Sequence, residues 1–169
     1  PLSIPTMYDR AQQALYKLGP APVAETKADK NSYGFREGRS CADAVACAFN
    51  ALSKPNSAPW VLEGDIQGCF DNISFAWMLK NIPMDKAILH KWLRAGYVEN
   101  GIHYPTRKGV PQGGIISPTI SNMVLDGLEE AVRCAVPRRC RINFTRYADD
   151  FIITGKSKTI LGEAIQPVV

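Results

Sequence analysis

Three acidic residues in this sequence stand where carboxylates could bind a divalent cation. Asp149 and Asp150 lie between the alternating residues 142–146 and a short apolar run, a pattern that predicts a strand, an acidic turn and a second strand. Acidic side chains are poor strand formers, and two adjacent ones repel each other, so a pair placed there usually has a cation to bind. Asp65 follows a second apolar run, residues 60–62. Together these carboxylates predict a metal site for phosphoryl transfer, with two unrelated solvated turns as the alternative.

The chemistry of such a site sets what the fold must do. Phosphoryl transfer with two metal ions needs carboxylates that bridge cations about 3.5–4 Å apart. Magnesium prefers oxygen ligands and keeps several waters, so two or three aspartates from neighbouring strands are sufficient. Asp65 and Asp149 are far apart in the sequence, and only the tertiary fold could bring them together.

The composition is that of a folded, weakly basic chain. Its 169 residues are 46% hydrophobic, which predicts a packed core rather than disorder. Lys and Arg number 20 against 16 Asp and Glu, a formal net charge of +4. This excess is compatible with a polyanionic partner and equally with an ordinary solvated surface. The chain begins at Pro1 and ends beside a helix-like stretch, so we interpret it as a fragment of a longer protein.

The number of cysteines and the length of the apolar runs limit the cellular compartments in which we expect the protein. The sequence shows no charged leader before an apolar segment and no run long enough to span a bilayer, so neither a signal nor a membrane partner is expected. Five cysteines, an odd number without a Cys-x-x-Cys pair, disfavour a zinc site or a disulfide framework. We expect reduced thiols in a cytosol-like compartment, either the bacterial cytoplasm or an organelle.

Local patterns predict the elements that would position the acidic residues. Strands are expected at residues 60–66, largely buried, and on both sides of Asp149, with a hairpin around Asn100-Gly101. Helices are expected over residues 9–18, after a Ser40–Asp43 capping box, over 74–79 and 83–95, from Pro118 through Val132, and from about 157, whereas residues 20–33 are expected to be irregular. This alternation predicts an α+β fold in which helices back one face of an antiparallel sheet.

Five segments resemble the motifs of reverse transcriptases. Residues 65–73 resemble the first catalytic motif of that family, and residues 147–150 resemble the second. Between them, residues 109–118 match the Pro-Gln-Gly motif of the nucleotide pocket. Residues 31–40 match a segment typical of group II intron-encoded enzymes, and residues 1–10 look like the finger region of that branch. The motifs occur in the family's order and cover nearly the whole chain.

The resemblance implies an RNA-directed DNA polymerase with a right-hand fold. Residues 1–58 would be a partial fingers region and residues 59–169 the palm. Asp65 and Asp149 would hold two Mg²⁺ ions, for which Mn²⁺ could substitute, and the backbone carbonyl of Ile66 would add an oxygen ligand. Asp150 would complete the acidic set.

Further residues acquire roles from the same resemblance. Phe70 would pack under the incoming sugar and exclude a 2′-hydroxyl, with ordinary core packing as the alternative. Gln112 and Gly113 would contact the incoming nucleotide, although Gly113 could equally serve a plain turn. Arg36 and Arg39 would contact the template backbone, because guanidinium groups pair well with phosphate, or else be solvated at the surface.

The resemblance also implies partners, and it leaves alternatives open. An RNA template, a DNA primer and a deoxynucleoside triphosphate would bind the enzyme, and the full-length protein would bind intron RNA and assist splicing and mobility. Glu37 and Gln67 depart from the intron branch, where Pro and Lys are usual, and the lost or reversed charge would soften a template contact. The alternatives are a splicing maturase module with a dispensable polymerase site, and a retron or diversity-generating reverse transcriptase. We expect the isolated 169 residues to be weakly active or inactive.

Overall fold

The computed structural model describes residues 4–137 and 139–169, and these fall into two compact units. The first unit combines the chain up to Lys27 with Gly68–Val124, and the second combines Ala28–Gln67 with Leu125–Val169. Of the finger-like segment expected at the start of the chain, residues 1–3 lie outside the described residues. The division into fingers at 1–58 and palm at 59–169 concerns function rather than compactness, and it stays a prediction.

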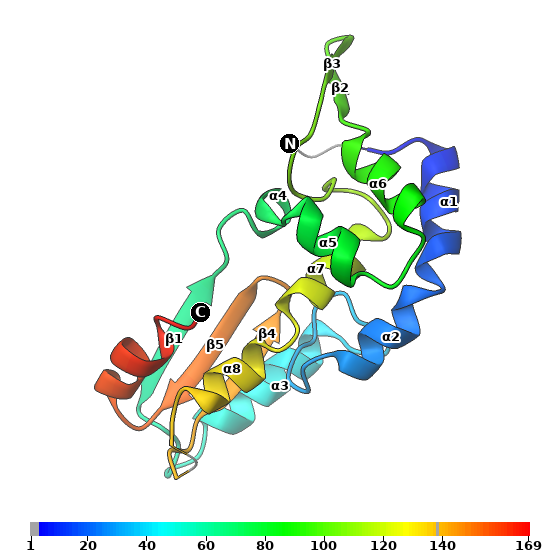
Figure 1. Cartoon of the computed structure of the whole chain (residues 1–169). Coiled ribbons are helices and arrows are strands. Elements are labelled where there is room, and N and C mark those ends of the chain that lie inside the picture. The colour runs from blue at the N-terminus through cyan, green and yellow to red at the C-terminus, as the bar shows by residue number, and fades with distance from the viewer. Residues whose placement is uncertain (1–3, 138) are drawn as a thin grey trace. The chain divides into compact units, whose positions relative to one another are not determined.

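The second unit is built on an antiparallel three-stranded sheet (Figure 1). Its strands are β1 (Trp60–Asp65), β4 (Asn143–Tyr147) and β5 (Asp150–Gly155), in the order β1-β5-β4. The predicted hairpin on both sides of Asp149 is therefore confirmed, and the strand after the turn occupies the centre of the sheet. Because β5 pairs with both neighbours, the acidic turn at its start lies beside the end of β1.

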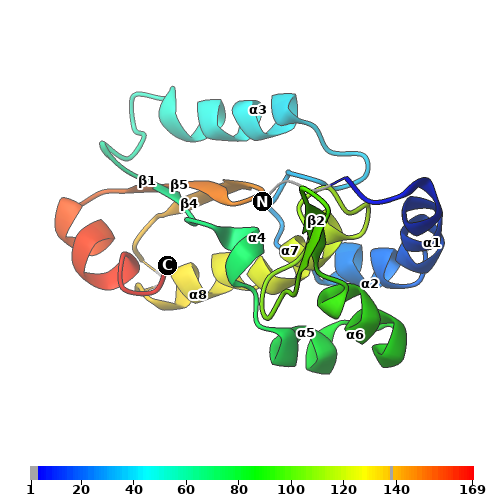
Figure 2. The same ribbon diagram turned by 90° about the horizontal axis from the view of Figure 1, so that it is seen from above.

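Helices cover both faces of this sheet, so the expectation of helices on one face alone is wrong. Figure 2 shows α3 (Cys41–Leu52) on one side and α8 (Leu128–Cys134) with the π-helix η1 (Ile160–Ile165) on the other. The strand periodicity explains this, because successive side chains point to opposite faces. On one face, Thr145 donates a hydrogen bond to the Sγ atom of Cys47 in α3 at 3.3 Å. The core on the other face is formed by Val132, Val136, Ile142, Phe144, Phe151, Ile153, Leu161 and Ile165.

Strand β1 is exposed, although its apolar sequence predicted a largely buried strand. Trp60 and Val61 are 45% and 48% exposed. The reason is the sheet order, since β1 is an edge strand with a neighbour on one side only. The strand itself forms where it was expected and ends at Asp65.

Helix α3 begins with the capping box that the sequence predicted. The Ser40 hydroxyl accepts a hydrogen bond from the Asp43 amide, and the Asp43 carboxylate accepts one from the Ser40 amide. Ala44 of this helix is buried, whereas the larger apolar residues Val45 and Phe49 are exposed. Small side chains therefore form the contact with the sheet.

The first unit is mainly helical. Its elements are α1 (Met7–Lys17), α2 (Pro20–Lys27), α4 (Cys69–Asn72), α5 (Phe75–Asn81), α6 (Lys86–Arg94), the hairpin strands β2 (Tyr97–Glu99) and β3 (Ile102–Tyr104), and α7 (Ser117–Leu125). Its core is formed by Ile73, Met78, Ile82, Leu89, Leu93, Val110, Ile116 and Ile120. Asn100 and Gly101 both have positive φ, 52° and 79°, which confirms the tight hairpin predicted at this dipeptide.

Two helix predictions need correction. Residues 20–33 were expected to be irregular, but α2 begins at Pro20, because proline is tolerated at the first position of a helix, where its missing N–H has no partner to lose. The helix expected from Pro118 through Val132 is divided in two. Gly127 has φ +99° and forms the N-cap of α8, which interrupts the helical backbone between α7 and α8. Among the described residues, no helix is both long enough and apolar enough to cross a membrane.

Candidate active site

The acidic turn is a tight connection between β4 and β5. Tyr147 and Asp150 are paired across the hairpin, which leaves Ala148 and Asp149 as the connecting residues. Ala148 has φ +57°, a left-handed conformation that residues other than glycine seldom adopt. It is also buried, at 8% exposure, while Asp149 is half-buried and Asp150 is exposed. The turn is thus held in one specific backbone conformation just before the two acidic residues.

The sheet register brings the end of β1 to this turn. Asp65 is the direct partner of Asp150 in the antiparallel pair of β1 and β5, so both side chains point to the same face of the sheet. The Ile66 amide donates a hydrogen bond to the Asp149 carbonyl, with an N···O distance of 3.3 Å. The predicted metal ligands Asp65, Ile66, Asp149 and Asp150 are therefore neighbours, although the sequence separates them into two groups.

These carboxylates affect one another electrostatically. The pKa of Asp150 is raised above its ordinary value, first by loss of hydration. Repulsion from the carboxylates of Asp149, Asp65 and Glu63 raises it further. Clustered oxygen ligands that repel one another in the free chain are suited to a hard divalent cation, which removes the repulsion. Within residues 4–137 and 139–169, however, no three Asp, Glu, His or Cys side chains form a ready-made metal cluster.

A buried arginine lies directly under the turn, and the sequence analysis missed it. Arg146 is fully buried, and its Nη1 atom donates to the Ala148 carbonyl at 3.1 Å. Its Nη2 atom forms an ion pair with Asp126 at 3.0 Å and lies 3.9 Å from Asp29. Burial lowers the pKa of Arg146 and raises that of Asp126, although the opposite charge of each partner acts against this. The sequence did contain one signal for this residue: a charged side chain at a position of β4 where the strand alternation directs side chains toward the core.

The segment that precedes α3 packs along β4 at the same place. The Arg146 amide donates to the Asn31 carbonyl, and the Tyr33 amide donates to the Arg146 carbonyl, both at 2.9 Å. Gly34 then passes so close to Ala148 that a Cβ atom on it would overlap the Ala148 backbone. The motif of residues 31–40 therefore packs against the acidic turn and stabilises it, a role that the sequence of the motif did not reveal.

The two arginines of that motif are bound to backbone carbonyls. The Nη1 atom of Arg36 donates to the carbonyls of Asp29 and Ser32, at 2.8 Å each. The Nη1 atom of Arg39 donates to the Lys30 carbonyl at 2.7 Å, and its guanidinium lies 5.3 Å from the centre of the Tyr33 ring. Both side chains stabilise the loop, and their contact with a template stays a prediction.

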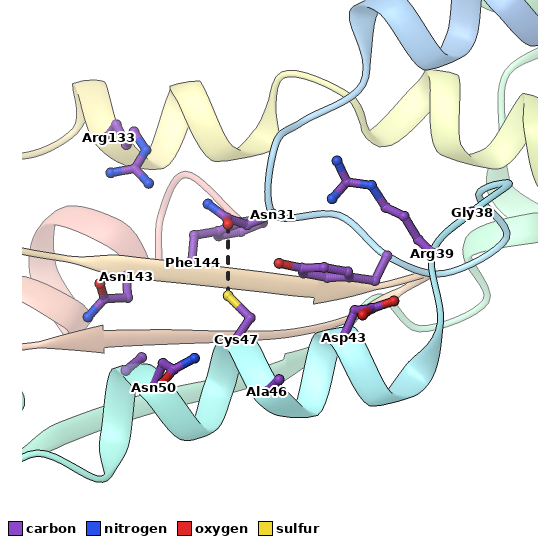
Figure 3. Close-up of a pocket in the computed structure, with 12 residues that line it drawn as sticks. Asn31, Gly38, Arg39, Asp43, Ala46, Cys47, Asn50, Arg133, Asn143 and Phe144 are labelled. Carbon is purple, nitrogen blue, oxygen red and sulfur yellow. Dashed lines mark hydrogen bonds between the residues drawn. The ribbon is translucent and has the colours of Figure 1, made fainter.

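Arg39 also lines a polar pocket beside α3 (Figure 3). The pocket measures about 770 Å³ and is bordered by Asn31, Tyr33, Cys47 and Phe144 among others. Burial, and next a hydrogen bond with Cys47, raises the pKa of Tyr33 to about 12. The Cys47 thiol also donates to the Asn31 side-chain oxygen, with an S···O distance of 3.8 Å. The pocket is thus lined by groups that bond to one another.

The predicted nucleotide-contacting residues belong to the first unit. Phe70 is half-buried and packs against the core of that unit, and its carbonyl accepts from the Val110 amide at 2.7 Å. Gly109 has φ +82° and lies against the backbone of Phe70 and Asp71. These backbone contacts therefore hold the start of the Pro-Gln-Gly segment beside Phe70. Gly113 follows it with φ +102° and an exposed backbone, and Gln112 is half-buried.

Comparison with known proteins gives one family over the whole chain. Residues 1–169 match the family described as reverse transcriptase (RNA-dependent DNA polymerase). The group II intron-encoded protein LtrA of Lactococcus lactis subsp. cremoris is 36% identical over 139 residues, which cover 78% of this chain and 22% of LtrA. Protein YkfC of Escherichia coli (strain K12) is 28% identical over 98% of this chain and 53% of its own length. The chain thus spans about a fifth and about half of these relatives.

The solved structures agree on the fold. An apo telomerase from Candida tropicalis superimposes on 95% of this chain and 38% of its own, with a TM-score of 0.59 and 16% identity. At that identity the likeness concerns the fold alone. It confirms the predicted α+β polymerase architecture with an antiparallel sheet backed by helices.

Proposed function

The chain belongs to the reverse transcriptase family, and we propose that it carries the palm and part of the fingers of an RNA-directed DNA polymerase of the group II intron type. The resemblance to group II intron-encoded proteins that the motifs indicated is confirmed by the similarity to LtrA. The activity of the whole protein is our proposal, because the chain spans only part of these relatives. The observation that carries it is the pairing of Asp65 with Asp150 beside the Asp149 turn.

The reaction joins a deoxynucleotide to a primer. The primer 3′-hydroxyl gives up its proton to water, its oxygen forms a bond to the α-phosphorus of the triphosphate, the bond from that phosphorus to the bridging oxygen breaks, and pyrophosphate leaves. Family membership implies a divalent cation, and we propose two Mg²⁺ ions, which Mn²⁺ could replace. When bound, these ions would activate the hydroxyl and neutralise charge on the triphosphate.

The residues of the second unit would hold those ions. Asp65 and Asp149 would hold them, the Ile66 carbonyl would supply one further oxygen, and Asp150 would complete the acidic set near the primer end. The raised pKa of Asp150, due first to loss of hydration and then to repulsion from Asp149 and Asp65, supports this assignment, since a cation would relieve the repulsion. The Ile66 to Asp149 hydrogen bond supports it as well, because it fixes the backbone of both ligand groups at one place.

Other residues would select the substrates. Phe70 would leave no room for a 2′-hydroxyl, while Gln112 and Gly113 would contact the incoming nucleotide. RNA template binding follows from the family, and we assign contacts with its backbone to Arg36 and Arg39. In the full-length protein we propose that intron RNA is a second partner and that the protein assists splicing and mobility. The maturase-only and retron-like alternatives are not favoured by the relatives found.

Primer extension by the full-length protein tests this proposal. Wild type, Asp149→Asn and Asp85→Asn are compared on an RNA template with a DNA primer. Asp85 is a suitable control because it is the N-cap of α6, and asparagine caps a helix equally well. We expect extension by wild type and Asp85→Asn and none by Asp149→Asn. Equal extension by all three proteins would refute the assigned chemistry.

A further inference from the structure

The residue one position before the Tyr-Ala-Asp-Asp motif has a function that the motif itself does not include. We propose that Arg146 is a positioning residue, which holds the Ala148–Asp149 peptide in the orientation that aims Asp149 at the metal site. This inference rests on the proposed polymerase function. It goes beyond that function by assigning a role to a buried group that touches neither substrate nor metal.

The backbone on both sides of Asp149 is held by hydrogen bonds. On its N-terminal side, the Ala148 carbonyl accepts from the Arg146 Nη1 atom at 3.1 Å. On its C-terminal side, the Asp149 carbonyl accepts from the Ile66 amide of the neighbouring chain segment at 3.3 Å. The backbone of Asp149 is therefore held at both peptides. One contact comes from the interior of the unit and the other from the segment that carries Asp65.

The contact from Arg146 maintains an unusual backbone conformation at Ala148. Ala148 has φ +57°, a left-handed backbone conformation that residues other than glycine seldom adopt. Such a conformation persists only where its surroundings over-determine it. Here Arg146 binds the carbonyl of that residue, and Gly34 packs against its amide and Cα.

The Arg146 side chain is itself held in place by two aspartates. Its Nη2 atom is bound by Asp126 at 3.0 Å, with Asp29 at 3.9 Å. Asp29 in turn accepts from the backbone amides of Gly127 at 3.0 Å and Glu129 at 3.2 Å, at the start of α8. The guanidinium is therefore anchored to a helix terminus while its other nitrogen reaches the turn. A guanidinium suits this task because its planar fork can serve two acceptors at once.

Lysine at position 146 separates positioning from mere stability. Arg146→Lys keeps the charge for Asp126, but one ammonium group replaces the planar fork that serves two acceptors. We expect kcat of the full-length protein to fall about 10- to 100-fold, as is typical when an outer-shell partner of a metal ligand is lost. The KM for the deoxynucleotide should change little. Titration with Mn²⁺ should show weakened binding in the absence of substrate.

Amide hydrogen exchange provides a readout that does not depend on activity. In Arg146→Lys the protection of the Ile66 amide should decrease, because its acceptor on Asp149 is no longer held. Gly34→Ala places a methyl group against the Ala148 backbone in the same turn and should give the same pattern. Arg133→Lys is the matched control. Arg133 belongs to the same charged region through Glu129, at 2.7 Å, and should leave kcat and Ile66 protection unchanged.

The experiments distinguish failure of the positioning role of Arg146 from failure of the proposed polymerase function. If Asp149→Asn abolishes extension while Arg146→Lys and Gly34→Ala retain wild-type kcat, Mn²⁺ affinity and Ile66 protection, the positioning role is wrong and the polymerase function stands. If Arg146→Lys loses activity only in proportion to the fraction unfolded, the role is also wrong. Loss of kcat in the folded variant, together with faster exchange at Ile66, supports it.

Discussion

Placing a methyl group on Gly64 should displace the strand that carries Asp65. Gly64 immediately precedes Asp65 and pairs with Phe151 across β1 and β5. The Phe151 ring covers this glycine, and a Cβ atom built there would lie 2.7 Å from its Cε2 atom and closer still to Cζ. The ring is held in the core, 6.4 Å from the Phe144 ring between centroids. It cannot turn aside without disturbing that packing.

The magnitude follows from this overlap. Overpacking of a filled core costs about 1–3 kcal/mol. For a chain of 169 residues, about 2 kcal/mol corresponds to a Tm lower by about 4–8 °C. Because β1 is an edge strand, it should yield by moving away from β5 and carry Asp65 with it. A displacement of about 1 Å at a catalytic group can cost about 100-fold in rate, so Gly64→Ala should lose more activity than its stability explains.

The assay compares kcat of primer extension at saturating deoxynucleotide with the Tm of each full-length variant. Gly162→Ala is the control, since a Cβ atom at Gly162 meets nothing within 4 Å. Adding Phe151→Leu to Gly64→Ala should restore part of both quantities, because the shorter side chain relieves the overlap. Full kcat in Gly64→Ala, with the Tm lowered as expected, would show that the position of β1 does not set the catalytic geometry.

Three further results should follow. Phe70→Val should raise the incorporation of ribonucleotides relative to deoxynucleotides by about 10- to 100-fold in competitive kcat/KM measurements. An unchanged ratio of the two kcat/KM values would show that Phe70 serves core packing alone. Glu129→Gln should lower the free energy of unfolding at pH 7 by about 1–3 kcal/mol, because Glu129 accepts from Arg133 and Asn31. Burial raises the pKa of Glu129, but these hydrogen bonds outweigh burial, so the net shift of the pKa is downward. The stabilisation by the Glu129 carboxylate is therefore present above the ordinary glutamate pKa and is lost as the pH falls through the lowered pKa. In acid denaturation curves the free energies of unfolding of wild type and Glu129→Gln should converge, and a difference that stays constant with pH would contradict this. Removing divalent cations with EDTA should stop extension, and Mg²⁺ should restore it.

Local signals predicted the elements that present the acidic residues. The alternation before Asp149, the Ser40–Asp43 capping box and the Asn100-Gly101 dipeptide each act over a few residues, and each gave the structure expected. The meeting of residues 65 and 150 could be expected from the family resemblance, but the spacing alone could not place them together. It depends on β5 lying between β1 and β4.

The remaining features depend on contacts between distant parts of the chain. The exposure of Trp60 could not be foreseen because it follows from the edge position of β1. The burial of Arg146 depends on Asp126 and Asp29, which the sequence places 20 and 117 residues earlier. The start of α2 at Pro20 was missed for a different reason, since the same proline that ends one helix can begin the next.

The central claim is that Asp65 and Asp149 share divalent cations during nucleotide addition. The most direct measurement is an experimental structure of the full-length protein with an RNA template, a DNA primer, a non-hydrolysable deoxynucleotide and Mg²⁺. Our account predicts two ions about 3.5–4 Å apart, each touched by oxygen atoms of both aspartates. Ions bound elsewhere, with these two side chains pointing away from each other, would contradict it.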